Sequence, residues 1–186
     1  MTLKTNQTTK TNITSIQLPN ESHIQQIKML NKKYLITYLT EVQKQKGFIR
    51  IKYSDDDIRR IIDNKEIVIA LNNDSVIGYY LIGRTSQNND LEYQKNKAAN
   101  LFETHNILFD KVGYGCQVCI DEKFRNNGFF REMLNILFDV VKNKYSHMLC
   151  SISESNTASL KTHITNGWQL VDFNDIIYFL ICKIPK

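Results

Sequence analysis

The sequence predicts an α/β domain built on a mixed sheet, and three observations predict this fold class. Residues 116–130 alternate in polarity and then pass through a short turn into a segment with helical periodicity. Residues 66–71 and 75–84 have strand composition and flank Asn-Asn-Asp, the pattern of a β-hairpin. A helix-length connection leads from the first of these segments to a further strand at 147–153, so the two strands are expected to run parallel.

Length and composition favour one soluble domain. The chain has 186 residues, of which 42% are apolar and 23% charged, which is ordinary for a globular protein with a sizeable core. Residues 1–12 are rich in Thr, Asn and Lys, so we expect a flexible tail before a single domain at 13–186. The N-terminus lacks an apolar secretory signal, and the longest apolar run is too short for a membrane span. We therefore expect a cytoplasmic protein with no membrane partner.

The charge and the cysteines argue against a nucleic-acid-binding protein and a metalloprotein. The net charge of +5 is spread along the chain, which suits an anionic cofactor but is too diffuse to indicate nucleic-acid binding. The four cysteines lie in or beside apolar segments, and no second Cys or His pair completes a metal-binding set. We expect reduced, buried thiols and no metal.

The first elements have clear local signals. We expect a short edge strand at 13–18 and then a helix at 21–40, with Ile24, Ile27, Leu30 and Leu35 on its apolar side. A basic loop at 44–52 separates this helix from a second one, which begins after Ser54 because a capping residue followed by three acids is typical of a helix start.

The hairpin at 66–84 follows this second helix. Gly78 lies inside its second strand and indicates a bulge or the close approach of another backbone. Residues 85–112 are polar with a helical middle; they either border a substrate mouth or pack on the sheet edge. The remaining elements are expected to be a strand at 113–120, a helix at 130–144, a strand at 147–153, a helix at 157–165, and an antiparallel pair of strands at 168–171 and 175–184.

The turn at 125–128 is the first candidate binding site. A helix that begins directly after a strand leaves several backbone N–H groups unpaired, and these groups with the helix dipole attract phosphate or pyrophosphate. Gly128 would let a ligand approach the backbone, and Arg125 would add positive charge. The turn lacks the glycine fingerprints of phosphate loops, so a strand–turn–helix connection without a ligand is the alternative.

A second segment favours the ligand-binding interpretation. The residues at set intervals one helix later are Asn156, Ser159, His163, Gly167 and Trp168. Together with Arg125-x-x-Gly128-x-Phe130, their order and spacing resembles two motifs of the GNAT superfamily of acyl-CoA N-acyltransferases. The resemblance covers about residues 66–184. It implies about seven strands, mostly antiparallel around a central splayed parallel pair, with helices on both faces.

The resemblance also implies a cofactor site. Acetyl-CoA is the expected co-substrate, with its pyrophosphate on the turn and its pantetheine paired with exposed backbone at 118–120. The implied cofactor-binding residues are Val118, Cys119, Ile120, Arg125, Asn126, Asn127, Gly128, Phe129, Phe130, Asn156 and Ser159. The family has a small residue at the place of Phe130, so we expect a tighter or shifted end of the phosphate cradle.

The same resemblance also implies catalytic residues. His163 stands where many family members carry a Tyr thought to protonate the leaving thiolate, so it is the candidate general acid; simple packing of this side chain is the alternative. An alkylammonium must lose a proton before it can attack, and Glu154 is the nearest candidate base. A water chain is the equal alternative to Glu154.

The acceptor side is the least defined part. The candidate substrate-binding residues are Tyr34, Tyr38, Phe48 and Tyr114. Tyr114 has the spacing at which some family members carry a Glu, and the other three lie in the region that borders the acceptor pocket of the family. Ordinary core packing is the alternative for these aromatic residues.

The function favoured by these observations is acetyl transfer from acetyl-CoA to an amine by direct attack in a ternary complex. No Cys occupies a recognisable nucleophile position, which disfavours an acyl-enzyme. The acceptor is a small-molecule or peptide amine, and the chain could act as a homodimer. One alternative is a non-catalytic acyl-CoA-binding or sensing module of the same fold. The other, a nucleotide-binding domain unrelated to CoA, is disfavoured by the segment at 156–168.

Overall fold

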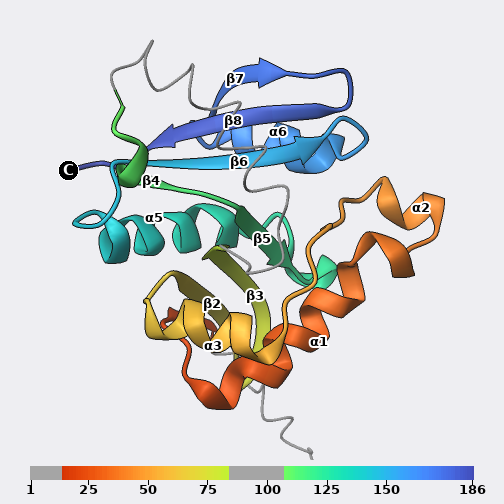
Figure 1. The fold of residues 1–186 in the computed structure, drawn as a ribbon. Coiled ribbons are helices and arrows are strands. Elements are labelled where there is room, and N and C mark those ends of the chain that lie inside the picture. Colours follow the sequence, from red (N-terminus) through yellow and green to blue (C-terminus); the bar gives the residue numbers. More distant parts are fainter. Residues whose placement is uncertain (1–13, 84–106) are drawn as a thin grey trace, which may run out of the picture.

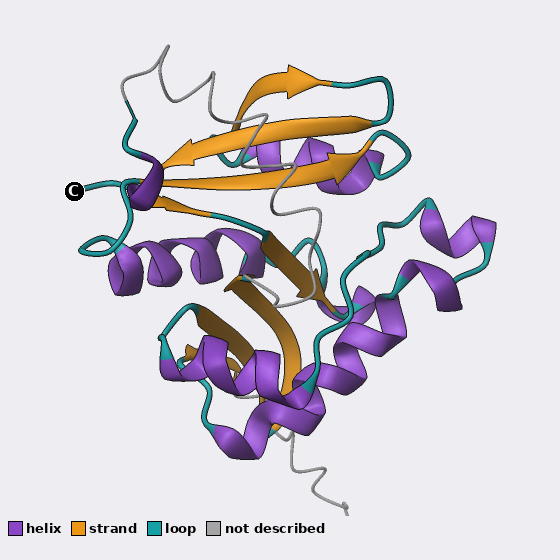
Figure 2. Cartoon of the chain, in the orientation of Figure 1, coloured by secondary structure: helices purple, strands orange, loops and turns teal. Residues whose placement is uncertain are grey.

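The computed structural model describes residues 14–83 and 107–186, which form two four-stranded sheets with helices packed against them (Figure 1, Figure 2). The predicted α/β class with a mostly antiparallel strand arrangement is confirmed, although the strands divide into two sheets. The predicted tail at 1–12 and most of the predicted polar segment at 85–112 lie outside the described residues.

The first sheet is antiparallel throughout. Its strands, in order across the sheet, are β1 (Thr14–Gln17), β2 (Ile67–Asn72), β3 (Ser75–Ile82) and β5 (Cys116–Ile120). The hairpin predicted at 66–84 is β2–β3. Ala70 pairs with Gly78 but Leu71 pairs with Val76, so the sheet has a bulge beside Gly78. A Cβ on Gly78 would also lie 3.2 Å from the carbonyl oxygen of Cys119, so both predicted reasons for this glycine are confirmed.

The second sheet contains the parallel pair. Its order is β4 (Val112–Gly113), β6 (His147–Ser153), β8 (Ile177–Lys183) and β7 (Gln169–Phe173). The parallel pairing of β4 with β6 is limited to two residues of each strand. The chain then leaves β6 and continues as β5 beside β3.

The strand predicted at 113–120 is therefore two strands in two different sheets. Gly115 explains the change of partner: its φ is +69°, and a Cβ there would lie 2.1 Å from the carbonyl oxygen of Gly83. The chain can approach β3 this closely only without a side chain at this position. β5 and β6 consequently diverge, which is the splayed pair that the sequence predicted.

The helix predicted at 21–40 is present as far as Tyr34, and the prediction is wrong beyond that residue. A 3-10 turn at Glu21–His23 leads into α1 (Ile24–Tyr34), and Leu35 then adopts an extended conformation. The Ile36 N–H donates to the carbonyl of Ile49, so a partner distant in sequence replaces the helical one. A 3-10 turn (Ile36–Tyr38) and the short helix α2 (Glu41–Lys44) follow.

The other predicted helices are present. α3 (Asp55–Asp63) begins at Ser54 with reciprocal capping bonds between Ser54 and Asp57. α5 (Phe129–Val141) follows the turn after β5, and α6 (Thr157–Thr165) begins at Asn156. No helix in the described part of the chain has the length and apolar character needed to cross a bilayer.

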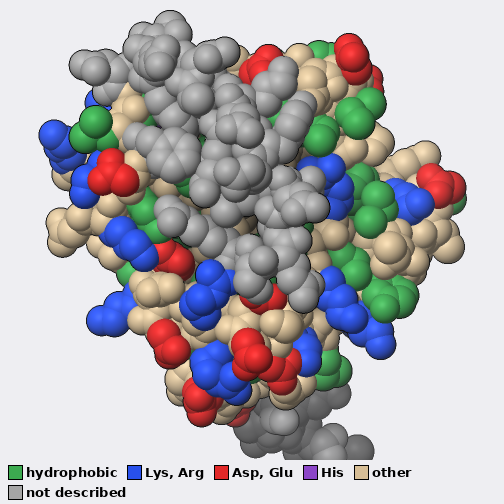
Figure 3. Space-filling model, viewed as in Figure 1, with side chains coloured by type: hydrophobic (Ala, Val, Ile, Leu, Met, Phe, Trp, Pro, Cys, Tyr) green, Lys and Arg blue, Asp and Glu red, His purple; other side chains and the backbone are tan. Residues whose placement is uncertain are grey.

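Alternate residues of β2 face two different cores. Val68 and Ala70 belong to the core shared with α5 and the second sheet, whereas Ile67 and Ile69 belong to the core under α1 and α3. α5 therefore packs between the two sheets (Figure 1). The cleft described below lies at its N-terminal end. On the face seen in Figure 3, Lys and Arg side chains are interspersed with Asp and Glu, so the positive net charge forms no single patch there.

Candidate functional site

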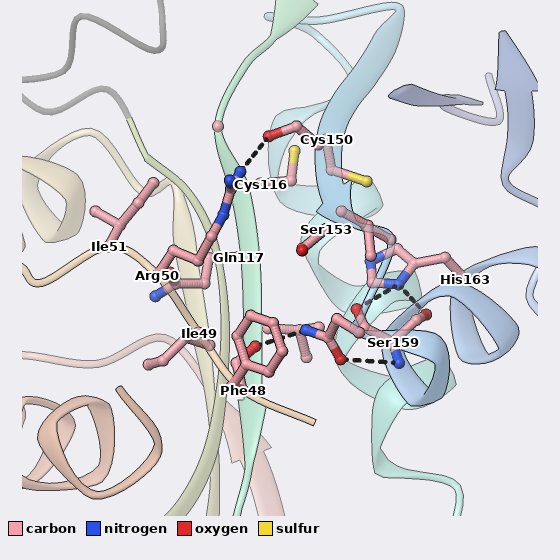
Figure 4. Close-up of a pocket in the computed structure, with 15 residues that line it drawn as sticks. Phe48, Ile49, Arg50, Ile51, Cys116, Gln117, Cys150, Ser153, Ser159 and His163 are labelled. Carbon is pink, nitrogen blue, oxygen red and sulfur yellow. Dashed lines mark hydrogen bonds between the residues drawn. The ribbon is translucent and has the colours of Figure 1, made fainter. Parts of the chain in front are cut away.

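Two adjoining hollows lie where β5 and β6 diverge. The larger, the main cleft, measures about 850 Å³ and lies between the end of α1, the loop at 46–49, β5, the start of α5, and α6. The smaller, the inner cavity, measures about 60 Å³ and lies between residues 48–51, β5 and β6 (Figure 4). The residues that line both are Phe48, Ile49, Val118, Asn156, Ser159 and His163.

β5 presents an open backbone edge to these hollows. Gly83 N–H donates to the carbonyl of Gly115, and Asp121 N–H donates to the carbonyl of Ile77. Because hydrogen-bonding direction alternates along an antiparallel strand, residues 117 and 119 also turn their backbone groups toward β3, whereas 116, 118 and 120 turn theirs away. β5 is an edge strand of its sheet, so Val118 offers its N–H and carbonyl to a ligand.

The side chain of Cys119 lies on the opposite face of the sheet from those of Val118 and Ile120. Its side chain is buried on the α1 side of the sheet, with Sγ 3.9 Å from the carbonyl oxygen of Leu30. Val118 and Ile120 lie on the other face, against the core around α5. Of the three predicted pantetheine-binding residues, Val118 and Ile120 therefore carry the outward-facing backbone groups.

The turn before α5 has the geometry of an anion site. Asn126 and Gly128 have φ values of +63° and +84°, and Gly128 is the residue immediately before the helix. Within residues 14–83 and 107–186, the backbone N–H groups of 126–131 donate no hydrogen bond. Successive unpaired N–H groups at a helix start form a concavity that favours phosphate oxygens.

Two features keep this turn open. The Asn127 amide donates to the carbonyls of Phe124 and Arg125, which fixes the turn from within. A Cβ on Gly128 would have its nearest neighbour, Glu132 Oε1, at 3.5 Å, so the glycine faces open space. The charged residues that line the main cleft are Lys46, Glu122, Arg125, Arg131 and Glu132, and Lys46 is paired with Glu122 at 2.5 Å.

Arg125 has a structural role that the sequence did not indicate. Its Nε donates to the carbonyl of Ile120 at 2.9 Å, and its Nη1 donates to the carbonyl of Lys46 at 2.6 Å. The guanidinium carbon also lies 4.8 Å from the centre of the Tyr34 ring. Arg125 thus clamps the loop at 46–49 and the end of β5 to α1, while its charge stays beside the turn.

Phe130 is accommodated without blocking the cradle. Its ring is buried, 5.4 Å from the ring of Tyr80 and 5.0 Å from that of His163 between centroids. The side chain therefore points into the core, while the backbone N–H remains on the turn. This orientation allows a large residue at a position where the family has a small one.

Asn156 joins α6 to the opposite wall. Its Oδ1 accepts from the N–H of Ser159 at 3.4 Å, and its Nδ2 donates to the carbonyl of Phe48 at 2.8 Å (Figure 4). The residue is buried and lines both hollows. The predicted capping role is confirmed, and the bond to Phe48 shows that the amide also holds the loop in place.

The surroundings of His163 favour packing over acid catalysis. The ring is 4% exposed and lies edge-on between the rings of Phe130 and Trp168. Its Nδ1 lies 2.8 Å from the carbonyl oxygen of Ser159, so this nitrogen carries the proton and donates it to the backbone. Burial lowers the pKa of His163 to about 4, against a weaker opposing effect of this bond. A neutral imidazole held in this way has no labile proton to give to a thiolate at neutral pH.

Four predicted site residues lie outside both hollows. Asn127 is one of them, and its amide bonds the carbonyls of Phe124 and Arg125 instead. Glu154 is exposed on the turn after β6. Tyr38 is 55% exposed because the break after α1 turns it outward. Tyr114 is buried with Val112 and Leu149, because the crossover between sheets turns it into the core of the second sheet. The other two predicted wall residues, Tyr34 and Phe48, do line the main cleft.

The structure adds two polar residues that the sequence analysis missed. Arg50 and Gln117 line the inner cavity. The Gln117 Nε2 donates to the Tyr79 hydroxyl at 2.9 Å, and the Asn31 Nδ2 donates to the same hydroxyl. Alternation along the strand could have indicated Gln117, because a polar residue among apolar neighbours stands out. No local sequence pattern distinguishes Arg50 from the other basic residues of its loop.

Known proteins share this fold. Neither a protein-family model nor a curated protein sequence matches the chain. Its structure is similar to that of yncA from Salmonella typhimurium with acetyl-CoA, at 14% identity and a TM-score of 0.62, covering 94% of this chain and 96% of that one. PaiA N-acetyltransferase from Thermoplasma acidophilum in complex with coenzyme A is 11% identical with a TM-score of 0.62, over 92% and 99% of the two chains.

A third similar structure names the family. It is an acetyltransferase of the GNAT family from Listeria monocytogenes, at 12% identity and a TM-score of 0.60, covering 91% of this chain and 94% of that one. At these identities the similarity establishes the fold alone. The chain therefore has the GNAT fold that its two sequence motifs predicted.

Proposed function

We propose that this protein is an N-acetyltransferase that moves an acetyl group from acetyl-CoA to an amine of a small molecule or peptide. The observation that carries the proposal is the combination, in one cleft, of unpaired N–H groups at 126–131 with the open edge of β5. The first suits a pyrophosphate, and the second suits the amides of pantetheine. The similar structures with acetyl-CoA and coenzyme A support the same ligand.

Each part of the cleft has a separate task in this proposal. Residues 126–130 bind the pyrophosphate through the backbone, and Gly128 leaves room for it. Val118 binds pantetheine through its backbone, with Asn156 and Ser159 forming the opposite wall. Acetyl-CoA supplies a thioester that an amine can attack, and the diverging strands leave the inner cavity for that amine.

The cysteines support direct transfer rather than an acyl-enzyme. Cys116 and Cys150 line the inner cavity, but burial raises the pKa of each thiol well above its usual value. Burial likewise raises the pKa of Cys119 to about 12 and that of Cys182 to about 11. All four are thus protonated at neutral pH, and a thiol is a poor nucleophile compared with its thiolate.

Proton transfer in this proposal relies on water. The described residues that line the inner cavity include no Asp or Glu, and neutral His163 keeps its proton on Nδ1, which donates to the Ser159 carbonyl. The amine therefore loses its proton to solvent. The protein contributes the positions of the two reactants rather than a side-chain base.

The lack of a side-chain acid or base among the described walls of the inner cavity also favours one alternative, a non-catalytic module that binds acyl-CoA. A site without a side-chain acid or base in its described walls could hold the cofactor without turning it over. Turnover separates the two functions.

The experiment is to incubate the purified chain with acetyl-CoA and a panel of amines, and to measure the release of free thiol. The panel should contain amino acids, simple alkylamines, a polyamine and a peptide N-terminus. Amine-dependent thiol release identifies the transferase. Binding of acetyl-CoA without thiol release from any amine would instead identify the binding module, and the absence of CoA binding would contradict both.

A further inference from the structure

We propose that the acceptor is a small amine that also carries a carboxylate, and that Arg50 binds this carboxylate at the inner cavity. The inference rests on the proposed acetyl transfer and adds the chemical class of its acceptor. It follows from the position of the cavity, the charge of its walls and the unused donors of Arg50.

The position of the inner cavity makes it the acceptor side. It adjoins the main cleft through shared walls that include Val118 and His163. Because the unpaired N–H groups of the turn lie in the main cleft, CoA is expected there. The inner cavity is then the space in which an amine can reach the thioester.

The charge of the walls favours an anionic group on that amine. Arg50 is the one Lys, Arg, Asp or Glu among the described residues that line the inner cavity. A second ammonium on the acceptor, as in a polyamine, would meet this guanidinium without a carboxylate to offset the repulsion. A carboxylate would instead gain charge-assisted hydrogen bonds.

Arg50 is placed to make such bonds. Its side chain extends from the loop toward β6, where one Nη donates to the hydroxyl of Ser151 at 3.3 Å (Figure 4). In the described part of the chain this is its one hydrogen bond and it has no ion pair, so most of its five N–H donors remain available. The Ser151 contact holds the guanidinium over the cavity and reduces the entropy lost on binding.

Gln117 offers the complementary group for the amine. Its Nε2 is committed to Tyr79, which leaves its carbonyl oxygen as an acceptor in the wall of the cavity. A donor for carboxylate and an acceptor for an amine thus lie in one hollow of about 60 Å³. The two groups together suit an amino carboxylate, for example an α-amino acid.

The test compares matched acceptors and matched variants. The acceptors are alanine with ethylamine and methionine with 3-(methylthio)propylamine, which differ within each pair by the carboxylate. The variants are Arg50→Gln and Lys52→Gln; Lys52 is an exposed cation of the same loop that lines neither hollow. The quantity measured is the ratio of kcat/KM within each pair. Intrinsic differences in amine reactivity cancel when this ratio is compared between proteins.

We expect Arg50→Gln to lower the preference for the carboxylated amine by roughly 10- to 100-fold, the usual worth of a hydrogen bond to a charged group. Lys52→Gln should leave the preference unchanged. Calorimetry with CoA present should show N-acetylmethionine binding to wild type and more weakly to Arg50→Gln. Melting temperatures of the variants check that both are folded.

Two results would overturn the inference while leaving acetyl transfer intact. One is a wild-type preference for a polyamine or for the amines without carboxylate. The other is an equal loss of kcat/KM for both members of each pair in Arg50→Gln, which would make Arg50 a structural link to Ser151. Failure to bind acetyl-CoA would contradict the proposed function itself and is measured separately.

Discussion

Replacing Asn156 with Ala should weaken both the fold and the cofactor site. The change removes the cap on Ser159, worth about 1 kcal/mol. It also leaves the buried carbonyl of Phe48 without its 2.8 Å partner, which costs about 1–3 kcal/mol. The sum is about 2–4 kcal/mol. In a chain of this size each kcal/mol shifts Tm by about 2–4 °C, so a central loss of 3 kcal/mol corresponds to about 6–12 °C.

The bond to Phe48 also predicts an effect on CoA. Without it the loop at 46–49 loses its tie to α6, and the main cleft loses the fixed position of one wall. We expect CoA affinity to fall about tenfold, measured by isothermal calorimetry at a temperature where the variant is folded. Ser54→Ala is the matched control, because it removes a helix cap of α3 outside the cleft. If both variants lose similar stability and both keep wild-type CoA affinity, Asn156 is only a cap and the reasoning fails.

Three further predictions concern single residues. Trp168 is 2% exposed, so Trp168→Ala should cost about 3–5 kcal/mol in urea unfolding; a loss under about 1 kcal/mol would contradict its place in the core. Burial lowers the pKa of His163 from 6.5 to about 4, so its contribution to stability is complete above pH 6.5 and is lost as the pH falls toward 4. Wild type should lose up to about 3 kcal/mol more than His163→Phe over this range, and parallel stability–pH curves would refute the burial argument. Glu154→Gln should retain kcat within about twofold in the thiol-release assay, because Glu154 lies outside both hollows; a large loss would restore it as the base.

The elements that the sequence predicted well are those with local causes. Ser54 followed by acids marks the start of α3, and the Asn-Asn-Asp turn marks the hairpin, because caps and turns depend on neighbouring residues. The turn at 125–128 was predictable for the same reason. Its unpaired N–H groups follow from a helix that begins directly after a glycine turn.

The features that the sequence did not predict depend on distant partners. The division of one strand into β4 and β5 requires Gly115 to approach Gly83, and the end of α1 requires Ile36 to pair with Ile49. The pKa of His163 depends on burial, to which the ring of Phe130 from the distant helix α5 contributes. No spacing rule reports such contacts, so the sequence could not indicate that His163 is enclosed in this way.

The central claim is that CoA binds the turn before α5, and a pair of glycine variants tests it most directly. Gly128 and Gly167 have nearly equal φ values, +84° and +88°, so replacement by Glu strains the backbone similarly at both positions. Only Gly128 of the two lines the main cleft. In calorimetric titrations with CoA, folded Gly167→Glu should bind like wild type, whereas folded Gly128→Glu should bind at least about tenfold more weakly, because its side chain brings bulk and negative charge to the phosphate site. Equal CoA affinity in the two folded variants would contradict the claim.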